Sequence, residues 1–227
     1  MKTSKIWSVI LAFCGVIFVI GFSIALPIWF RPFYYSQIEK LDIVDYSGFT
    51  REQIIKAYDD VLNYLNFGTP FATGELKYSE SGKSHFEDCK ILFDLDTWAT
   101  LISGLVLSAA LVLKRLKVLK PAKLAKFDWF FYSGIFAVLL PIVLGGAVAV
   151  DFENAFVVFH KIFFPGKENW MFNWYEDEII RILPSEFFMN CAIFIAVALF
   201  VLAIISIVVG IVNRRKFKNI EKHTAKG

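Results

Sequence analysis

The sequence contains only three cysteines among 227 residues: Cys14, Cys89 and Cys191. The number is odd, and two of the three fall inside apolar runs, so the sequence predicts no disulfide framework. The GxSxG motif of serine hydrolases, a glycine-rich phosphate loop and a paired-carboxylate pattern are also missing. These absences argue against a serine hydrolase, a nucleotide-dependent enzyme and a two-carboxylate hydrolase.

Asp, Glu, Lys, Arg and His are missing from four long apolar runs, which cover residues 6–30, 97–113, 129–150 and 187–213. The runs are near or above the length of about 20 residues that a membrane-spanning helix requires. The first run is longer than the apolar part of a signal peptide, so we expect it to be retained. Since ion transporters usually keep ionisable groups at membrane depth, ion or proton transport is not expected. Tryptophans at run ends are typical of interfacial anchors: Trp7, Trp29, Trp98 and Trp129.

The chain is 57% hydrophobic and contains 25 phenylalanines, which is too apolar for a soluble domain. Its charges divide by segment. The short segments 1–5, 114–128 and 214–227 carry 14 Lys/Arg and 2 Asp/Glu, whereas the long segments 31–96 and 151–186 carry 10 Lys/Arg and 19 Asp/Glu. Because cytoplasmic loops are rich in Lys and Arg, both termini are predicted to be cytoplasmic and the two long loops extracellular. The basic runs are interpreted as topology signals, with no nucleic-acid partner.

The predicted fold class is therefore an all-α integral membrane protein, with four transmembrane helices and an extracellular, mostly helical cap formed by two loops. The predicted order is a first span with a cytoplasmic N-terminus (1–30), cap loop 1 (31–96), a second span (97–113), a basic cytoplasmic loop (114–128), a third span (129–150), cap loop 2 (151–186), a fourth span (187–213) and a basic cytoplasmic tail (214–227).

Within the cap, Thr50 and Gln53 have the spacing of a capping box, and apolar residues recur after them at helical intervals. An amphipathic helix is therefore predicted over residues 50–65. A second helix, led by acidic residues, is predicted over 174–188, where it would enter the last span.

Three histidines are present, and two of them, His85 and His160, lie in the predicted extracellular loops; His223 lies in the polar tail. His160 lies in the stretch 152–174, in which 8 of 23 residues are Phe or Trp. If residues 154–164 are helical, bulky apolar side chains surround the ring, and desolvation keeps it neutral and able to accept a proton. The alternative is that His160 is an interfacial side chain held by a hydrogen bond and that His85 is a surface loop side chain. The helical neighbours of His160 would be Phe156, Val157, Phe163 and Phe164.

Two other chemistries use the same region. Cys89 follows His85 at i+4, which on a helix would form a Cys–His nucleophile pair. The two histidines together with carboxylates would suit zinc, although no HxxxH or HxxE spacing is present. Asp88, at i+3 from His85, would orient its ring if the segment is helical. The carboxylates considered for zinc are Glu87, Asp88, Asp151 and Glu153.

Two stretches resemble a known family. They are HFEDCKILF at 85–93 and FHKIFF at 159–164, with Trp170, Phe172, Asp177, Ile182-Leu183-Pro184 and Phe187-Phe188 following the second. With four predicted spans and loops of these lengths, the chain resembles the lipoprotein intramolecular transacylases of Gram-positive bacteria. The resemblance implies a plasma-membrane enzyme whose active site is on the extracellular face. It would move the sn-2 acyl chain of a diacylglyceryl lipoprotein to the α-amine of the N-terminal cysteine, giving the lyso form.

The resemblance also implies that His85 and His160 are the catalytic pair. It implies no metal and no cofactor, and its partners are diacylglyceryl-modified lipoproteins and membrane lipids. A non-catalytic lipid- or partner-binding membrane protein and a Cys- or metal-dependent lipid hydrolase remain as alternatives. The expected substrate-binding residues are Phe86, Asp88, Phe156, Phe159, Phe163, Phe164, Trp170 and Phe172.

Overall fold

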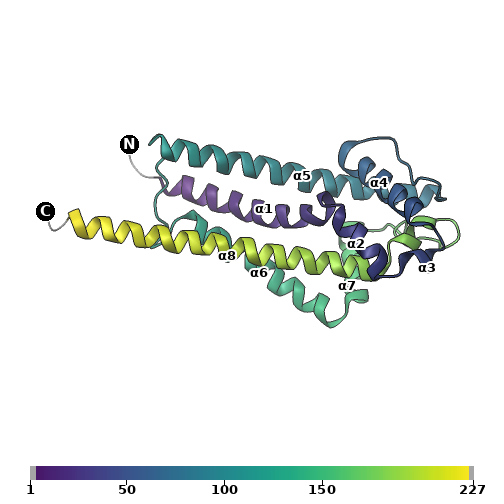
Figure 1. The fold of residues 1–227 in the computed structure, drawn as a ribbon. Coiled ribbons are helices and arrows are strands. Elements are labelled where there is room, and N and C mark those ends of the chain that lie inside the picture. Colours follow the sequence, from purple (N-terminus) through teal and green to yellow (C-terminus); the bar gives the residue numbers. More distant parts are fainter. Residues whose placement is uncertain (1–3, 225–227) are drawn as a thin grey trace. The chain divides into compact units, whose positions relative to one another are not determined.

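The computed structural model describes residues 4–224, except for the side chains of residues 140, 141, 143–150 and 216–224. Helices dominate the described chain (Figure 1). They are α1 (Lys5–Trp29), α2 (Pro32–Lys40), α3 (Ile43–Ser47), α4 (Arg51–Phe67), α5 (Glu80–Arg115), α6 (Trp129–Val150), α7 (Phe152–Phe163), the 3₁₀ helix η1 (Glu178–Ile182) and α8 (Ser185–Thr224).

Among the described residues, three helices are long and apolar enough to cross a membrane: Lys5–Trp29, Glu80–Arg115 and Ser185–Arg215. Trp129–Leu139 is a shorter apolar helix, the described part of α6. The all-helical fold with apolar helices agrees with the predicted class. α5 begins 17 residues before the predicted second span at residue 97, so the end of the first loop and that span form one continuous helix.

The chain divides into two compact units, which are described separately. Unit 1 contains residues 1–24, 97–145 and 196–227. Its helices approach closely at small residues: a Cβ built at Gly134 would lie 2.5 Å from the carbonyl oxygen of Ala203, and one at Gly210 would lie 2.7 Å from the backbone nitrogen of Phe131. Small residues let backbones come this near, as is usual between membrane helices.

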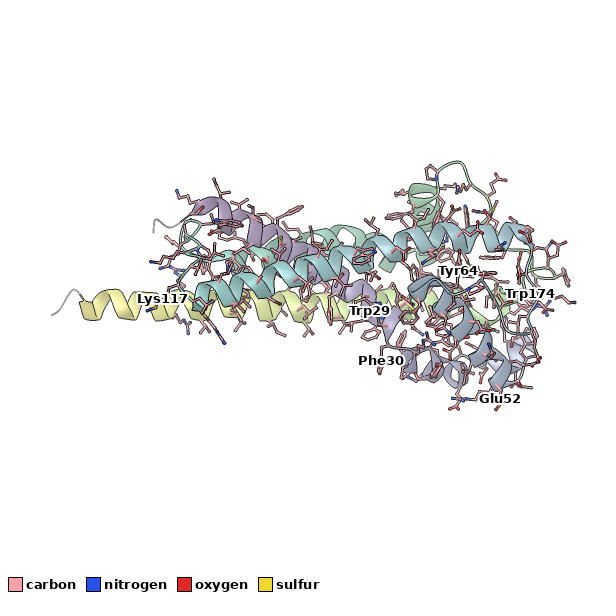
Figure 2. The ribbon with its side chains drawn as sticks, turned by 90° about the horizontal axis from the view of Figure 1, so that it is seen from above. Trp29, Phe30, Glu52, Tyr64, Lys117 and Trp174 are labelled. Carbon is pink, nitrogen blue, oxygen red and sulfur yellow. The ribbon has the colours of Figure 1, made fainter. Side chains whose placement is uncertain are left out.

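The predicted tryptophan anchors behave differently from one another. Trp7, Trp29 and Trp98 are exposed, as lipid-facing side chains would be, and Figure 2 shows Trp29 with Phe30 at the end of α1. Trp129 is only 3% exposed and packs with Leu11, Ala12 and Ala110 in unit 1. The prediction for Trp129 is therefore wrong, because its indole fills the space between helices instead of facing outward.

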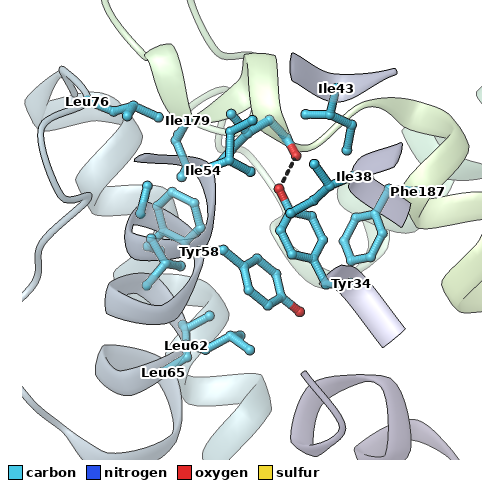
Figure 3. Close-up of a cluster of buried hydrophobic side chains, with 14 residues drawn as sticks. Tyr34, Ile38, Ile43, Ile54, Tyr58, Leu62, Leu65, Leu76, Ile179 and Phe187 are labelled. Atoms are coloured by element: carbon cyan, nitrogen blue, oxygen red, sulfur yellow. Dashed lines mark hydrogen bonds between the residues drawn. The ribbon is translucent and has the colours of Figure 1, made fainter. Parts of the chain in front are cut away.

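Unit 2 contains residues 25–96 and 146–195, the predicted cap and the ends of its helices. Its centre is a cluster of 14 buried apolar residues, in which Tyr34 stacks on Tyr58 at 3.7 Å between ring centroids (Figure 3). The Tyr34 hydroxyl donates to the carbonyl of Ile182 at 2.7 Å, which joins α2 to the second loop. α4 contributes six of these 14 residues and begins with the predicted capping box of Thr50 and Gln53.

The predicted helix over 174–188 is wrong. The chain forms only the short η1 (Glu178–Ile182), and α8 begins separately at Ser185. Pro184 explains the break, because proline disfavours helical backbone at the residue before it, and Leu183 accordingly has φ −123° and ψ 65°.

Asp177 fastens the second loop to the start of α5. It is 2% exposed, and its Oδ1 accepts hydrogen bonds from the backbone N–H and the hydroxyl of Ser79, each at 2.8 Å. Its Oδ2 accepts from the N–H of Asn173 at 3.1 Å. Ser79 in turn caps α5 by accepting from the N–H of Gly82 at 2.9 Å. This junction holds the loop that follows α7 against the first turn of α5, one turn before His85.

Candidate active site

The fold brings the two loop histidines together within unit 2. His85 lies in the second turn of α5, and His160 lies near the end of α7. Their ring centroids are 5.7 Å apart, and the residues are only 5% and 7% exposed. The interpretation of His85 as a surface loop side chain is therefore wrong. Two ionisable rings buried side by side are a candidate functional site, because burying such groups is unfavourable and often serves catalysis.

Aromatic rings surround this pair. Phe164 contacts both histidines, with centroid distances of 5.0 Å to His85 and 5.7 Å to His160. Phe172 lies edge-on to His85 at 5.5 Å, and Trp170 lies 4.9 Å from His160. The remaining ring neighbours are Phe86 beside His85 and Phe156 and Phe159 beside His160.

The predicted aromatic residue Phe163 is placed differently. It is 49% exposed and packs against Phe159 in a tilted arrangement, with 4.6 Å between ring centroids. Phe159 is itself 46% exposed while its ring meets His160 edge-on at 5.4 Å. α7 therefore has an inner face that carries His160 and an exposed apolar face. Pro165-Gly166 follows its end, and Gly166 has φ +73°.

The hydrogen bond of His160 defines its tautomer. Nδ1 lies 2.7 Å from the carbonyl oxygen of Phe156, and since a carbonyl can only accept, Nδ1 carries the proton. In the neutral ring, Nε2 then holds the basic lone pair. Burial lowers the pKa of His160, while the bond to Phe156 acts in the opposite direction. The ring is thus neutral near pH 7 and available as a proton acceptor.

His85 is kept neutral more strongly. Burial is the largest cause, and the charge that His160 would carry adds to it, so the pKa of His85 falls to about 4. The carboxylate of Asp88 acts in the opposite direction but does not offset these effects. Two adjacent buried rings disfavour each other's charge, so at most one proton is readily added to the pair.

Asp88 was expected to orient His85 directly, but its carboxylate is bound by other groups. Lys167 donates to Oδ1, and the Asn169 amide donates to Oδ2 at 2.9 Å. Burial acts to raise the pKa of Asp88, but these two hydrogen bonds outweigh it and the pKa is lowered. Asp88 is therefore an ionised anchor for the loop after α7.

Sequence reasoning missed Lys167 and Asn169. Neither belongs to a motif, and both lie about 80 residues from Asp88 in a loop whose path the residue pattern does not reveal. The sequence does show an excess of acidic over basic residues in the two loops. Lys167 itself, next to Pro165-Gly166, was the only local indication of an ion pair.

Cys89 contacts His85: its Sγ lies 3.3 Å from Nε2. The predicted i+4 geometry is thus present. Burial raises the pKa of the thiol to about 12, and the nearby negative charge of Asp88 acts in the same direction as a smaller cause. A nucleophilic cysteine requires the opposite shift, because the thiolate is the reactive form. The thiol is therefore a neutral S–H group beside the ring.

Comparison with known proteins decides the family. The sequence profile of the family "Lipoprotein intramolecular transacylase Lit" matches residues 9–188, which is more than half of the chain. The chain belongs to the lipoprotein intramolecular transacylase family. The expected resemblance is thereby confirmed, and the match includes both histidines and the whole of the loop after α7.

Solved structures share the fold. The chain superposes on the membrane integral lipoprotein intramolecular transacylase Lit from Bacillus cereus with a TM-score of 0.81 and 24% identity, covering 94% of this chain and 96% of that chain. A variant of the Bacillus cereus protein with a histidine-to-arginine mutation gives 0.75 and 22% identity, covering 96% and 92%. An uncharacterized protein of Aquifex aeolicus (strain VF5) is 28% identical over 145 residues. That match covers 64% of this chain and 62% of the relative, less than two thirds of its length.

For this transacylase-family chain, Cys89→Ala is expected to keep turnover within a few-fold of the unsubstituted protein, because the raised pKa keeps the thiol from acting as a nucleophile. Turnover of a diacylglyceryl lipopeptide by the purified variant, followed by mass spectrometry, checks this. Cys191→Ala, the other cysteine of unit 2, is the matched control. Loss of turnover in Cys89→Ala and in Cys89→Ser, with both variants folded, would indicate a catalytic thiol.

Among the described residues, no group of three or more His, Cys, Asp or Glu side chains is placed to hold a metal ion. Independence from metals stays a prediction. Turnover is expected to survive treatment with EDTA, and recovery of a chelated enzyme by zinc would contradict it.

Proposed function

We propose that the protein moves the sn-2 acyl chain of a diacylglyceryl lipoprotein to the α-amine of the same N-terminal cysteine. The observation that carries the proposal is the pair of neutral, buried imidazoles 5.7 Å apart among aromatic rings. Family membership supports an acyl transfer on a lipoprotein, and the pair supplies what that transfer requires. The product is the lyso form, with one acyl group on nitrogen and one on the glyceryl unit.

The chemistry needs proton transfer and positioning. The amine nitrogen attacks the ester carbonyl carbon and forms a C–N bond. The tetrahedral intermediate then breaks its bond to the glyceryl oxygen. The amine loses one proton and the glyceryl oxygen gains one, so the reaction is balanced without water, metal or an acyl-enzyme. General acid–base catalysis of such a transfer is worth about 10²–10⁴-fold.

His160 is the better supported proton acceptor. Its Nδ1–H is held by the Phe156 carbonyl, so Nε2 presents a fixed lone pair. His85 is then placed to exchange a proton with the leaving glyceryl oxygen. The two rings influence each other's protonation, since a proton on one ring disfavours a proton on the other.

The aromatic walls serve the orientation of the substrate. The amine and the ester of one lipoprotein meet only through a medium-sized ring, and holding the two groups in contact removes several kcal/mol of the barrier. Phe164, which touches both histidines, and Phe172 exclude water from the rings. Water exclusion matters because hydrolysis of the same ester competes with transfer.

The function is tested with purified protein and a synthetic diacylglyceryl lipopeptide. The expected product has the mass of the substrate, because the transfer is an isomerisation, and its fragments place the acyl group on nitrogen. A product lighter by one acyl chain, together with free fatty acid, would indicate a lipid hydrolase. No change of the substrate would support the non-catalytic alternative.

Transfer within one molecule is tested by mixing two lipopeptides, one with isotope-labelled acyl chains and one with a labelled peptide. Each N-acyl product is expected to carry only the labels of its own substrate. Product that carries both labels would show acyl movement between molecules and contradict the intramolecular reaction.

We further propose four spans, with α6 as the additional one, both termini cytoplasmic and the histidine pair on the extracellular side of a bacterial plasma membrane. The charge division between short and long segments supports this topology. In a cysteine-free background, a membrane-impermeant thiol reagent added to intact cells is expected to label a cysteine at Ser81 and to spare one at Ala122. The reverse labelling would overturn the topology.

A further inference from the structure

Two buried polar atoms beside the histidine pair have no hydrogen-bond partner: Nδ1 of His85 and Oδ1 of Asn169. Leaving such atoms unpaired is unfavourable, and native structures keep few of them. Asn169 nevertheless lies near enough to His85 that its side chain contributes to raising the pKa of the ring. The two orphans are thus near each other and chemically complementary.

The orientation of the Asn169 amide follows from its partners. Asp88 is ionised and can only accept hydrogen bonds, so the amide group that faces it at 2.9 Å is the NH₂. The same NH₂ lies 3.4 Å from the hydroxyl oxygen of Ser84. Oδ1, on the other arm of the amide, is therefore turned away from Asp88. Lys167 holds the other carboxylate oxygen, Oδ1, so the carboxylate has little freedom to release the amide.

The contact with Cys89 is compatible with one tautomer of His85 in particular. The thiol is neutral, and its sulfur lies 3.3 Å from Nε2 of His85. When the S–H donates, a lone pair on Nε2 accepts it. In a neutral imidazole the proton then resides on Nδ1, the nitrogen for which Asn169 Oδ1 is the complementary acceptor.

We propose that Asn169 is a positioning residue for His85: its Oδ1 accepts the Nδ1–H of His85 when substrate closes the cluster, which makes Nε2 the proton-transferring atom. Asp88 and Lys167 fix the orientation of the amide. Catalytic hydrogen bonds are often long without substrate and tighten in the complex. This explains why Nδ1 of His85 and Oδ1 of Asn169 are both unpaired although one hydrogen bond would satisfy them. The role in turnover rests on the proposed function, whereas the tautomer does not.

The tautomer is tested on the full-length protein with ¹⁵N-labelled histidine, and the His85 signals are assigned by their loss in His85→Asn. At pH 7 the expected spectrum shows a protonated Nδ1 and an unprotonated Nε2 for His85. A protonated Nε2 in the unsubstituted protein overturns the proposal without the need for any variant of Asn169.

Turnover tests the positioning role. Asn169→Ala is expected to lower kcat about 10–100-fold, as loss of an outer partner of a functional histidine does, with little change in KM. Asn173→Ala is the matched control, because Asn173 lies in the same loop and its side chain accepts only from the exposed N–H of Tyr175. Combining Asp88→Ala with Asn169→Ala is expected to cost little more than Asn169→Ala alone, since both act through one contact.

A change of charge separates positioning from loop stability. Asn169→Asp places a carboxylate beside His85, which raises the pKa of the ring. The reacting form accepts a proton and is therefore neutral, so the acidic limb of the pH–rate profile moves to higher pH. Unchanged kcat and pH profile in both Asn169 variants overturn the proposal. If the unsubstituted protein yields no lyso product, the proposed function fails, and the ¹⁵N spectrum still decides the tautomer.

Discussion

Replacing either His85 or His160 by asparagine is expected to lower turnover about 10²–10⁴-fold, the range that general acid–base catalysis supplies. Asparagine keeps much of the size and the hydrogen bonding of histidine but has no basic nitrogen. At position 160 the amide can still donate to the Phe156 carbonyl, so the fold is expected to persist. The loss should therefore appear in kcat, measured on a diacylglyceryl lipopeptide by mass spectrometry.

His223→Asn is the control, because that histidine lies in the polar C-terminal tail of the sequence. The double variant is informative too. If the rings act as one unit, His85→Asn combined with His160→Asn costs much less than the product of the two single effects. A folded single variant that turns over at the unsubstituted rate would remove that histidine from the mechanism.

Gly82→Ala is expected to be the most damaging substitution of a single small residue in unit 2. A Cβ at this position would lie 2.3 Å from Oδ1 and 2.9 Å from Cγ of Asp177, and 3.0 Å from a ring carbon of Phe172. Asp177 cannot retreat, since both carboxylate oxygens hold backbone N–H groups. Forcing a methyl group into such a contact costs about 1–3 kcal/mol.

Two readouts are expected to change together in Gly82→Ala. The melting temperature in detergent falls, and turnover falls, because Phe172 contacts His85 and Asp177 holds the loop that carries Asn169. Ser81→Ala, at the exposed neighbouring position of the same helix turn, is the matched control and should change neither. A Gly82→Ala protein with the unsubstituted melting temperature would contradict the described contact.

Local patterns in the sequence were sufficient for most helices. The apolar runs predicted the regions of α1, α5, α6 and α8, because a helix pairs all backbone N–H and C=O groups of a long uncharged segment in a membrane. The capping box predicted the start of α4 within one residue. Such features depend on neighbours within a few positions. The failures occurred where a single residue changes the path, as Pro184 does, or where packing decides exposure, as it does for Trp129.

The candidate site required more than local pattern. His85 and His160 are 75 positions apart, and nothing in their spacing predicts a centroid distance of 5.7 Å. The family resemblance predicted that they form a pair. The residue pattern alone did not decide between a catalytic pair and two unrelated side chains. The aromatic shell followed from helical spacing for Phe156 and Phe164, but not for Phe172. Asn169 and Lys167 depend on the path of the loop, which Asp177 fixes through contacts about 100 residues distant.

The contact between Cys89 and His85 affects how inhibition experiments are interpreted. An alkylating reagent that reached Cys89 would place its adduct about 3.3 Å from Nε2 and block that nitrogen sterically. Inactivation by a maleimide would then resemble loss of a catalytic thiol, although we expect the thiol to perform no step. With a pKa of about 12, the reaction would be slow and would accelerate with alkaline pH. The same geometry makes Cys89 an anchoring point for covalent inhibitors, whose selectivity would come from the surrounding aromatic rings.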